Sequence, residues 1–203
     1  MIRPSVPLRA ILFGLSAFAL SFAPGAHAFA ADADPVDSRQ EPSLEGLFFD
    51  WSLYGMQENG NLTCYLSSGI ERSSETVARR RPAVVLITNR PAEGKRGVVS
   101  VNPGYVYEEG SAVLLTIGRK QFHMFTADGS AWAQDGDDQQ IVAAIHSGST
   151  LVVTGRMKGG PATTDTFSLK GFGPALAALD HACPVAGAPA ASGAAPHRRK
   201  KPR

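Results

Sequence analysis

The stretch GLFFDWSLYGMQENGNLTCYL, residues 46 to 66, predicts a β-hairpin. Its first part, up to Gly55, mixes aromatic and aliphatic side chains with small or polar ones, which is typical of a strand. Asn59-Gly60 suits the left-handed positions of a tight turn, and residues 62–66 follow as the second strand. The chain therefore begins its folded part with antiparallel β-structure.

Short β-branched or aromatic runs continue along the following hundred residues or so, and each is bounded by Gly, Pro, Asn or Asp. Together with the first hairpin they make eight strands, a number typical of a β-sandwich or a β-barrel. The further strands are expected at residues 83–88, 97–101, 112–117, 121–126, 150–155 and 163–169.

Two helical segments interrupt this pattern. Asp137 or Asp138 can cap a helix over residues 139–146, whose apolar side chains fall on one face. A second helix is expected to begin at Pro174, because proline suits a first turn, and to run toward Cys183. The local patterns thus predict an all-β domain with one short helix and a C-terminal helix.

Residues 1–28 have the pattern of a Sec-type signal peptide. Arg3 and Arg9 precede an apolar run, and Ala26-His27-Ala28 offers small residues at a cleavage site, although cleavage after Ala30 fits equally well. The apolar run is shorter than the roughly 20 residues that a membrane-spanning helix needs. The pattern predicts export and a periplasmic or secreted protein without a transmembrane segment.

Composition divides the remaining chain into three parts. Residues 29–45 are expected to form a flexible leader, residues 46–184 the folded domain, and residues 185–203 a disordered basic tail. The 18 Asp+Glu and all but seven of the 20 Lys+Arg lie between the signal peptide and the tail, so the domain is acidic. This distribution argues against a compact nucleic-acid-binding domain, and the length of 203 residues argues against a multidomain enzyme.

The basic end of the chain is its strongest charge feature. Outside the cytoplasm, a flexible cationic segment can bind anionic envelope polymers or an acidic partner, and it can equally serve as a solubilising extension. The candidate anion-binding or envelope-binding residues are Arg198, Arg199, Lys200, Lys201 and Arg203.

Cys64 and Cys183 are the two cysteines of the chain. An even number of cysteines in an oxidising compartment favours a disulfide, which would join the start of the domain to its end. Two unpaired thiols or a redox pair are the alternatives, and the absence of a C-x-x-C motif argues against redox catalysis.

No local motif indicates catalysis or metal binding. The chain lacks G-x-S-x-G and H-E-x-x-H, and its histidines do not have metal-ligand spacing. His123 is expected as a surface or rim residue of a strand, and His146 near the C-terminal end of a helix. No catalytic residue, metal or cofactor is therefore expected.

Three further groups have both a structural and a functional interpretation. Arg79-Arg80-Arg81 is expected in a solvated loop, with an anion site as the alternative. Residues 135–138 hold three aspartates that fit a helix cap better than a calcium loop. Trp51 and Trp132 are expected in the core rather than as ligand-stacking residues.

Several of these motifs, taken in order along the chain, resemble the invasion-associated locus B family of exported proteins. The resemblance covers residues 46–184. It rests on FDWSLY (49–54), CYL (64–66), TNRPAEG (88–94), VSV (99–101), GY (104–105), EGSAV (109–113), AWA (131–133), TDTFSLKGF (164–172) and AC (182–183).

The resemblance implies an immunoglobulin-like β-sandwich in the periplasm or outside the cell, without cofactor or catalytic residues. On this resemblance we expect a non-enzymatic, virulence-associated protein that binds an unknown envelope or host component through its loops and tail. The alternative is a small periplasmic hydrolase whose site is assembled from distant residues, such as His123 and an acidic partner. The oligomeric state is not indicated.

Overall fold

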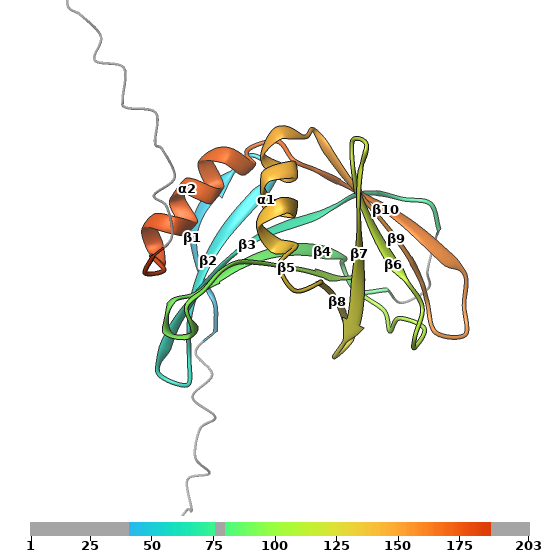
Figure 1. Ribbon diagram of the computed structural model, residues 1–203, viewed down its shortest axis with the longest axis horizontal. Helices are drawn as coiled ribbons and strands as arrows, with labels where there is room; N and C mark the ends of the chain where they lie inside the picture. Colours follow the sequence, from blue (N-terminus) through green and yellow to red (C-terminus); the bar gives the residue numbers. More distant parts are fainter. Residues whose placement is uncertain (1–40, 76–79, 188–203) are drawn as a thin grey trace, which may run out of the picture. The chain divides into compact units, whose positions relative to one another are not determined.

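The computed structural model describes residues 41–75 and 80–187, which form a mostly β structure with two helices (Figure 1). The predicted all-β class and both predicted helices are confirmed. The elements are β1 (Ser43–Phe48), β2 (Trp51–Glu58), β3 (Asn61–Ser73), β4 (Val84–Arg90), a 3-10 turn (Pro91–Glu93), β5 (Lys95–Asn102), β6 (Val113–Ile117), β7 (Lys120–Ala127), β8 (Ser130–Ala133), α1 (Asp138–Ser147), β9 (Thr150–Arg156), β10 (Ala162–Ser168) and α2 (Phe172–Ala182).

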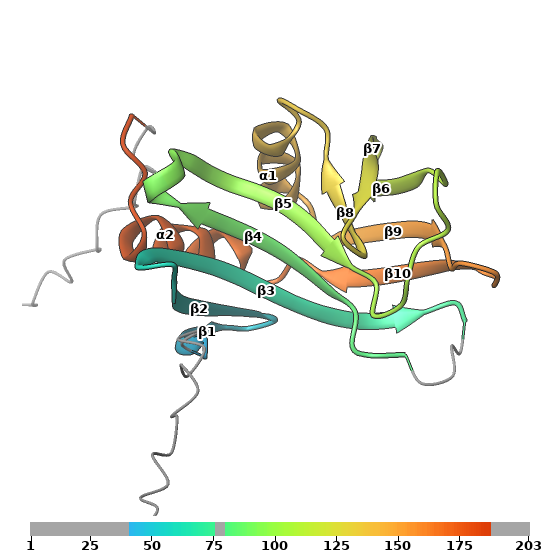
Figure 2. The ribbon, with the colours of Figure 1, turned by 90° about the horizontal axis from the view of Figure 1, so that it is seen from below.

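Eight of the strands close into a barrel-like sheet in the order β3, β10, β9, β6, β7, β8, β5, β4 and back to β3. All neighbouring strands are antiparallel. Strands β3, β4 and β5 run side by side along the molecule (Figure 2). Strands β1 and β2 extend the sheet beyond β3.

The expectation of an immunoglobulin-like sandwich is wrong, because a sandwich has two separate sheets. Here the 13-residue strand β3 pairs with β2 along its first part and with β10 along its last part, where Ser73 lies opposite Asp165. This pairing joins residues about 90 positions apart in the sequence and closes the sheet on itself.

The structure differs from the predicted elements in several places. Phe49 adopts a left-handed φ of 55°, so the strand-like run from residue 46 to residue 55 becomes two strands, β1 and β2, joined by a tight turn. The four-residue strand β8 was missed because it is too short for an alternation signal. Strand β1 begins at Ser43, inside the predicted leader; the signal peptide and residues 29–40 lie outside the described residues.

Gly171 fastens the β1–β2 turn to the start of α2. Its φ is 91°, and a Cβ there would lie 2.0 Å from the carbonyl oxygen of Phe48, so glycine is required on both grounds. Nearby, the Asp50 amide donates to the carbonyl of Lys170 at 3.3 Å. The turn and the helix are therefore held together through their backbones.

The helices pack on the inner face of the sheet. Trp51 is fully buried and its ring lies 4.9 Å from that of Phe172 in α2, while α1 buries Ile141 and Ile145. Trp51 is a core aromatic as expected. The expectation for Trp132 is wrong, because its side chain is only half-buried and its Nε1 donates a hydrogen bond to the carbonyl of Ala127. No helix among the described residues is long and apolar enough to cross a membrane.

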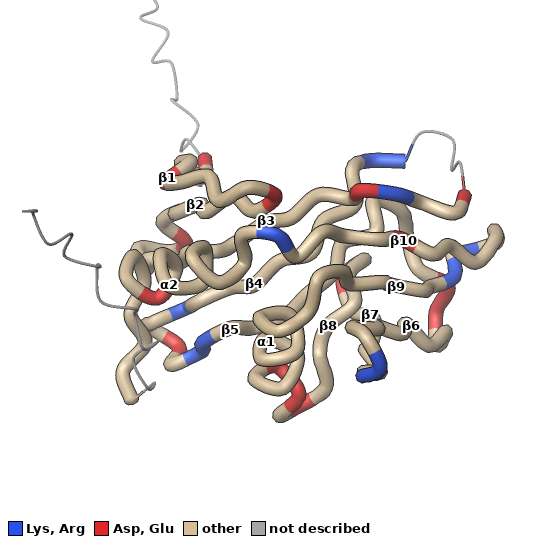
Figure 3. The backbone as a smooth tube through the Cα atoms, turned by 90° about the horizontal axis from the view of Figure 1, so that it is seen from above, with Lys and Arg blue, Asp and Glu red and all other residues tan. Residues whose placement is uncertain are grey.

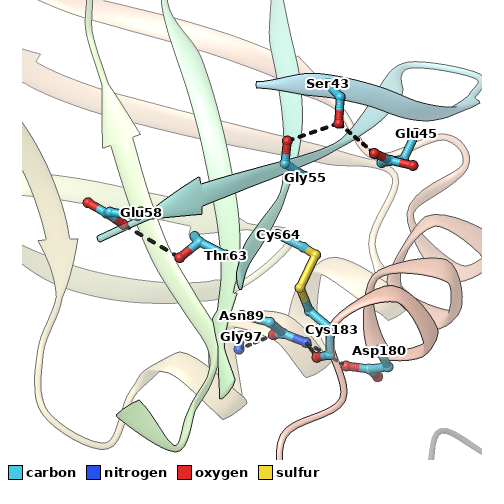
Figure 4. Close-up of a disulfide and its surroundings, with 10 residues drawn as sticks. All are labelled: Ser43, Glu45, Gly55, Glu58, Thr63, Cys64, Asn89, Gly97, Asp180 and Cys183. Atoms are coloured by element: carbon cyan, nitrogen blue, oxygen red, sulfur yellow. Dashed lines mark hydrogen bonds between the residues drawn. A yellow bond between two sulfur atoms is a disulfide. The ribbon is translucent and has the colours of Figure 1, made fainter. Parts of the chain in front are cut away.

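A disulfide joins Cys64 in β3 to Cys183 at the end of α2, as predicted (Figure 4). Both cysteines are buried, and no free cysteine remains. The bond ties residues 119 positions apart and anchors the C-terminal helix to the sheet.

Candidate functional site

The face of the sheet that points away from the core carries two neighbouring rows of residues. Residues paired across antiparallel strands point to the same face, so the register defines each row. Tyr54 and Tyr65 are half-buried whereas Leu53 and Leu66 are buried, which places the rows on the outer face. We call them the outer strip: Leu44, Tyr54, Tyr65, Thr88 and Val98 in one row, and Leu47, Ser52, Ser67, Leu86, Ser100, Trp132 and Phe125 in the other.

The outer strip contains no Lys, Arg, His, Asp or Glu. Its two ends expose large apolar side chains: Leu44 is 54% and Leu47 is 69% exposed at the β1 end, and Phe125 is 45% exposed at the β7 end. Scattered apolar residues are normal on a protein surface, whereas exposed apolar side chains gathered on one uncharged face are a feature of interaction sites.

A depression of about 520 Å³ lies within this strip. The rings of Tyr54 and Tyr65 stack with centroids 5.3 Å apart and form one wall. The lining residues are Pro42, Tyr54, Tyr65, Ser67, Val84 and Leu86.

The chemistry of the depression is apolar and uncharged. Burial, and next the neighbouring Tyr54, raise the pKa of the Tyr65 hydroxyl above its ordinary value, so the ring stays neutral at physiological pH. Ser67 and the tyrosine hydroxyls are the polar groups of the lining. Such a site can bind an apolar or aromatic group and orient it by a few hydrogen bonds, and it offers no acid–base pair.

A smaller and more polar depression, of about 230 Å³, lies beside the β2–β3 turn. Arg90 Nε lies 3.9 Å from a carboxylate oxygen of Glu58 and 3.8 Å from one of Glu93. The arginine is thus already flanked by opposite charges, and this depression is a weaker candidate for an anionic ligand.

The predicted positions of His123 and His146 are confirmed, and the histidines of the described residues come from three different elements. His123 is exposed on β7, on the same face as Phe125, and His146 is exposed in the last turn of α1. His181 is exposed in the last turn of α2. None of them lines the two depressions described above.

The acidic turn before α1 supports the sheet rather than a metal. Figure 3 shows its aspartates close together in red. Asp137 is the N-cap residue but forms no side-chain cap bond, whereas Asp138 Oδ1 accepts a hydrogen bond from the Val99 amide at 2.8 Å. Among the residues that the structure describes, no group of three or more His, Cys, Asp or Glu is arranged to hold a metal ion.

Arg80 is neither an anion site nor a solvated loop residue, so both interpretations of the arginine run are wrong at this position. Its side chain is only 10% exposed and forms two hydrogen bonds to the carboxylate of Asp165, which is 4% exposed. It also donates to the Pro103 carbonyl at 2.7 Å and lies 5.1 Å from the centroid of the Tyr105 ring. The bond to Asp165 is the main reason that the pKa of Arg80 is raised.

The disulfide lies within a second buried polar network (Figure 4). Asn89 is fully buried; its Nδ2 donates to Asp180 and to the carbonyl of Cys183, both at 3.1 Å. Its Oδ1 accepts from the Gly97 amide at 2.8 Å, and Arg96 Nε donates to Asp180 at 3.0 Å. Since these groups satisfy one another, the network is structural.

Sequence reasoning did not find the outer strip, although it contained a signal. Tyr54 and Tyr65 each alternate with buried residues in strands, so these large aromatics occupy positions where polar residues are usual. The strip became visible only with the register, because its residues come from seven strands. The predicted binding residues Arg198, Arg199, Lys200, Lys201 and Arg203 lie outside the described part of the chain.

A comparison with protein families matches residues 51–180, more than half of the chain, to the family described as Invasion associated locus B (IalB) protein. The matched range runs from the start of β2 into α2 and includes the whole closed part of the sheet. Neither the curated proteins nor the solved structures give a match.

Proposed function

The chain belongs to the invasion-associated locus B family, and we propose on this basis that it is an exported, non-enzymatic protein that binds an envelope or host component. The observation that carries the proposal is the outer strip with its tyrosine-lined depression. An uncharged surface of this kind favours a partner that presents apolar or aromatic groups.

The absence of enzymatic activity is part of the proposal. The tyrosine-lined depression has no nucleophile next to a base, and His123, His146 and His181 come from three different elements. Hydrolase assays on the purified protein with ester, amide and phosphate substrates test this view. Turnover that is lost in His123→Ala would contradict it.

Export to the periplasm or beyond is proposed from the signal-peptide pattern, and the buried disulfide fits an oxidising compartment. Cell fractionation combined with N-terminal sequencing tests this. A chain that stays in the cytoplasm with Met1 at its start would contradict it.

Photocrosslinking in native cells tests the binding site directly. A photoreactive phenylalanine replaces Leu86 in the depression, and a matched control replaces Val106, which is 61% exposed outside the outer strip. We expect a defined adduct from position 86 that Tyr65→Ala reduces at least tenfold, because the substitution removes one of the stacked rings. The same adducts from both positions, or none from position 86, would contradict the proposed site.

The basic tail is proposed as an auxiliary contact with anionic envelope polymers. Deletion of residues 185–203 is expected to remove a salt-dependent part of the binding to lipopolysaccharide or peptidoglycan. If binding after the deletion is unchanged and independent of salt, the tail has no such role.

A further inference from the structure

Strand β1 is the free edge of the sheet. It stands at one end of the strand order, whereas β4 at the other end pairs back onto β3. Among the described strands, β1 alone therefore has one side without a strand partner. Edge strands of soluble proteins are usually protected by charge or by a bulge. Strand β1 has both, in Glu45 and the irregularity beside it, yet it also exposes Leu44 and Leu47.

A β-bulge brings these two leucines to the same face. Leu44 lies opposite Tyr54 and Leu47 opposite Ser52, so both belong to the outer strip although they are three positions apart. The irregularity between Leu44 and Gly46 supplies the extra residue that makes this possible. The outer strip thus reaches the free edge with apolar side chains.

The register of β1 is compatible with a second copy of itself. A two-fold axis between Glu45 and Gly46 places Leu44 opposite Leu47 of the other copy, Ser43 opposite Phe48, and Glu45 opposite Gly46. Ser43 and Phe48 both pair with inward-facing positions of β2, so the faces match in this pair as they do in the leucine pair. Antiparallel pairing requires such matching, and no two like charges lie directly opposite.

We propose that two copies of this chain associate through antiparallel pairing of their β1 edges. The pairing joins the two outer strips through the Leu44–Leu47 contacts. Each copy has one such free edge, and the two-fold pairing uses the free edges of both copies. The association therefore closes at two copies and does not grow into a fibre. This inference is independent of the proposed ligand-binding function.

One group opposes the pairing and provides a sharp test of it. Glu45 accepts a hydrogen bond from Ser43 Oγ at 2.5 Å, and the axis brings the two copies of this carboxylate to diagonal positions. Since like charges repel across paired strands, Glu45→Gln is expected to strengthen the dimer severalfold.

Sedimentation velocity on the purified protein measures the association. We expect a concentration-dependent monomer–dimer equilibrium that Leu47→Lys weakens at least tenfold, because the lysine would lie against Leu44 of the other copy. Val106→Lys is the matched control, since it also places a lysine at an exposed apolar position, and it should leave the dimer unchanged. A monomer at all concentrations, or a dimer that Leu47→Lys does not weaken, would overturn the proposal.

Mixed cysteine variants test the register. Leu44→Cys and Leu47→Cys, mixed and oxidised, should form a cross-linked dimer at least tenfold faster than either variant alone, because the positions face each other only between copies. Val106→Cys mixed with Leu47→Cys is the control and should not cross-link. Equal cross-linking in single and mixed samples would overturn this register. The absence of any cross-link in the mixed sample would overturn it as well.

Discussion

Strands β3, β4 and β5 are held at each end by an arginine–aspartate pair, but the two ends differ in burial and in support. At one end the side chains of Arg80 and Asp165 are 10% and 4% exposed, and at the other those of Arg96 and Asp180 are 18% and 16% exposed. The second end also has the disulfide and the buried amide of Asn89. The first end therefore rests on a more deeply buried ion pair that Ser73 and the Pro103 carbonyl also contact, whereas the second end adds a covalent bond to a more exposed pair.

Among the changes that test this comparison, removal of the disulfide is expected to lower the free energy of unfolding most. The double variant Cys64→Ala/Cys183→Ala frees a loop with a sequence separation of 119 residues. In the chain-entropy model this lowers the free energy of unfolding by about 4 to 5 kcal/mol. Urea denaturation measures the loss, and a decrease below about 1 kcal/mol would show that the noncovalent network alone holds this end.

Asp165→Ala should destabilise the other end by about 3 to 5 kcal/mol, because it leaves the charge of Arg80 largely buried without a carboxylate, with only neutral acceptors at Ser73 and Pro103. The double variant Arg80→Ala/Asp165→Ala is the control and should lose less than the sum of the two single losses. Additive losses in urea denaturation would mean that the pair does not act as a unit.

Asp180→Ala is expected to cost less, about 1 to 3 kcal/mol, because Arg96 and Asp180 are more exposed to solvent than Arg80 and Asp165. Asn89 retains the carbonyl of Cys183, and Arg96 is partly exposed to solvent. Denaturation of this variant beside Asp165→Ala compares the two ends directly. A larger loss for Asp180→Ala would reverse the stated difference.

Asp138→Asn should change the stability of the fold least, and the change should depend on pH. Burial raises the pKa of Asp138, so the folded state holds the proton more tightly than the unfolded state. This contribution stabilises the fold below the unfolded pKa, about 3.9, and is lost as pH rises through the folded pKa.

The asparagine keeps an oxygen that can accept from the Val99 amide and removes the charge. We therefore expect equal or slightly higher stability than the native chain at pH 7, by less than about 1 kcal/mol for this half-exposed group, and no advantage near pH 3. Denaturation midpoints at the two pH values measure the difference. A clear loss of stability at pH 7 would show that the ionised carboxylate is preferred in the fold.

The elements that the sequence predicted well are those with a local cause. Asn59 and Gly60 both adopt positive φ in the β2–β3 turn, as is usual for an Asn-Gly pair in a tight hairpin turn. The helix over residues 139–146 and the one toward Cys183 follow from apolar periodicity and from a proline in the first turn.

The errors concern features with a distant cause. Arg80 stands in a run of three arginines that predicts solvent exposure, but Asp165, 85 positions away, draws it into a buried pair. Leu44 and Leu47 follow no regular alternation, because a bulge that depends on pairing with β2 sets their direction. Neither the candidate binding surface nor the buried ion pair has a local signature.

The sequence by itself determined the β character of the chain, its two helices, its disulfide and its family. Each of these depends on neighbouring residues, on cysteine number or on motifs in a preserved order. Only the tertiary structure decided that the sheet closes into a barrel rather than a sandwich, that Arg80 is buried, and that uncharged residues of seven strands form one strip. The physical reason is that strand pairing between residues far apart in the chain selects which side chains face the core and which face each other.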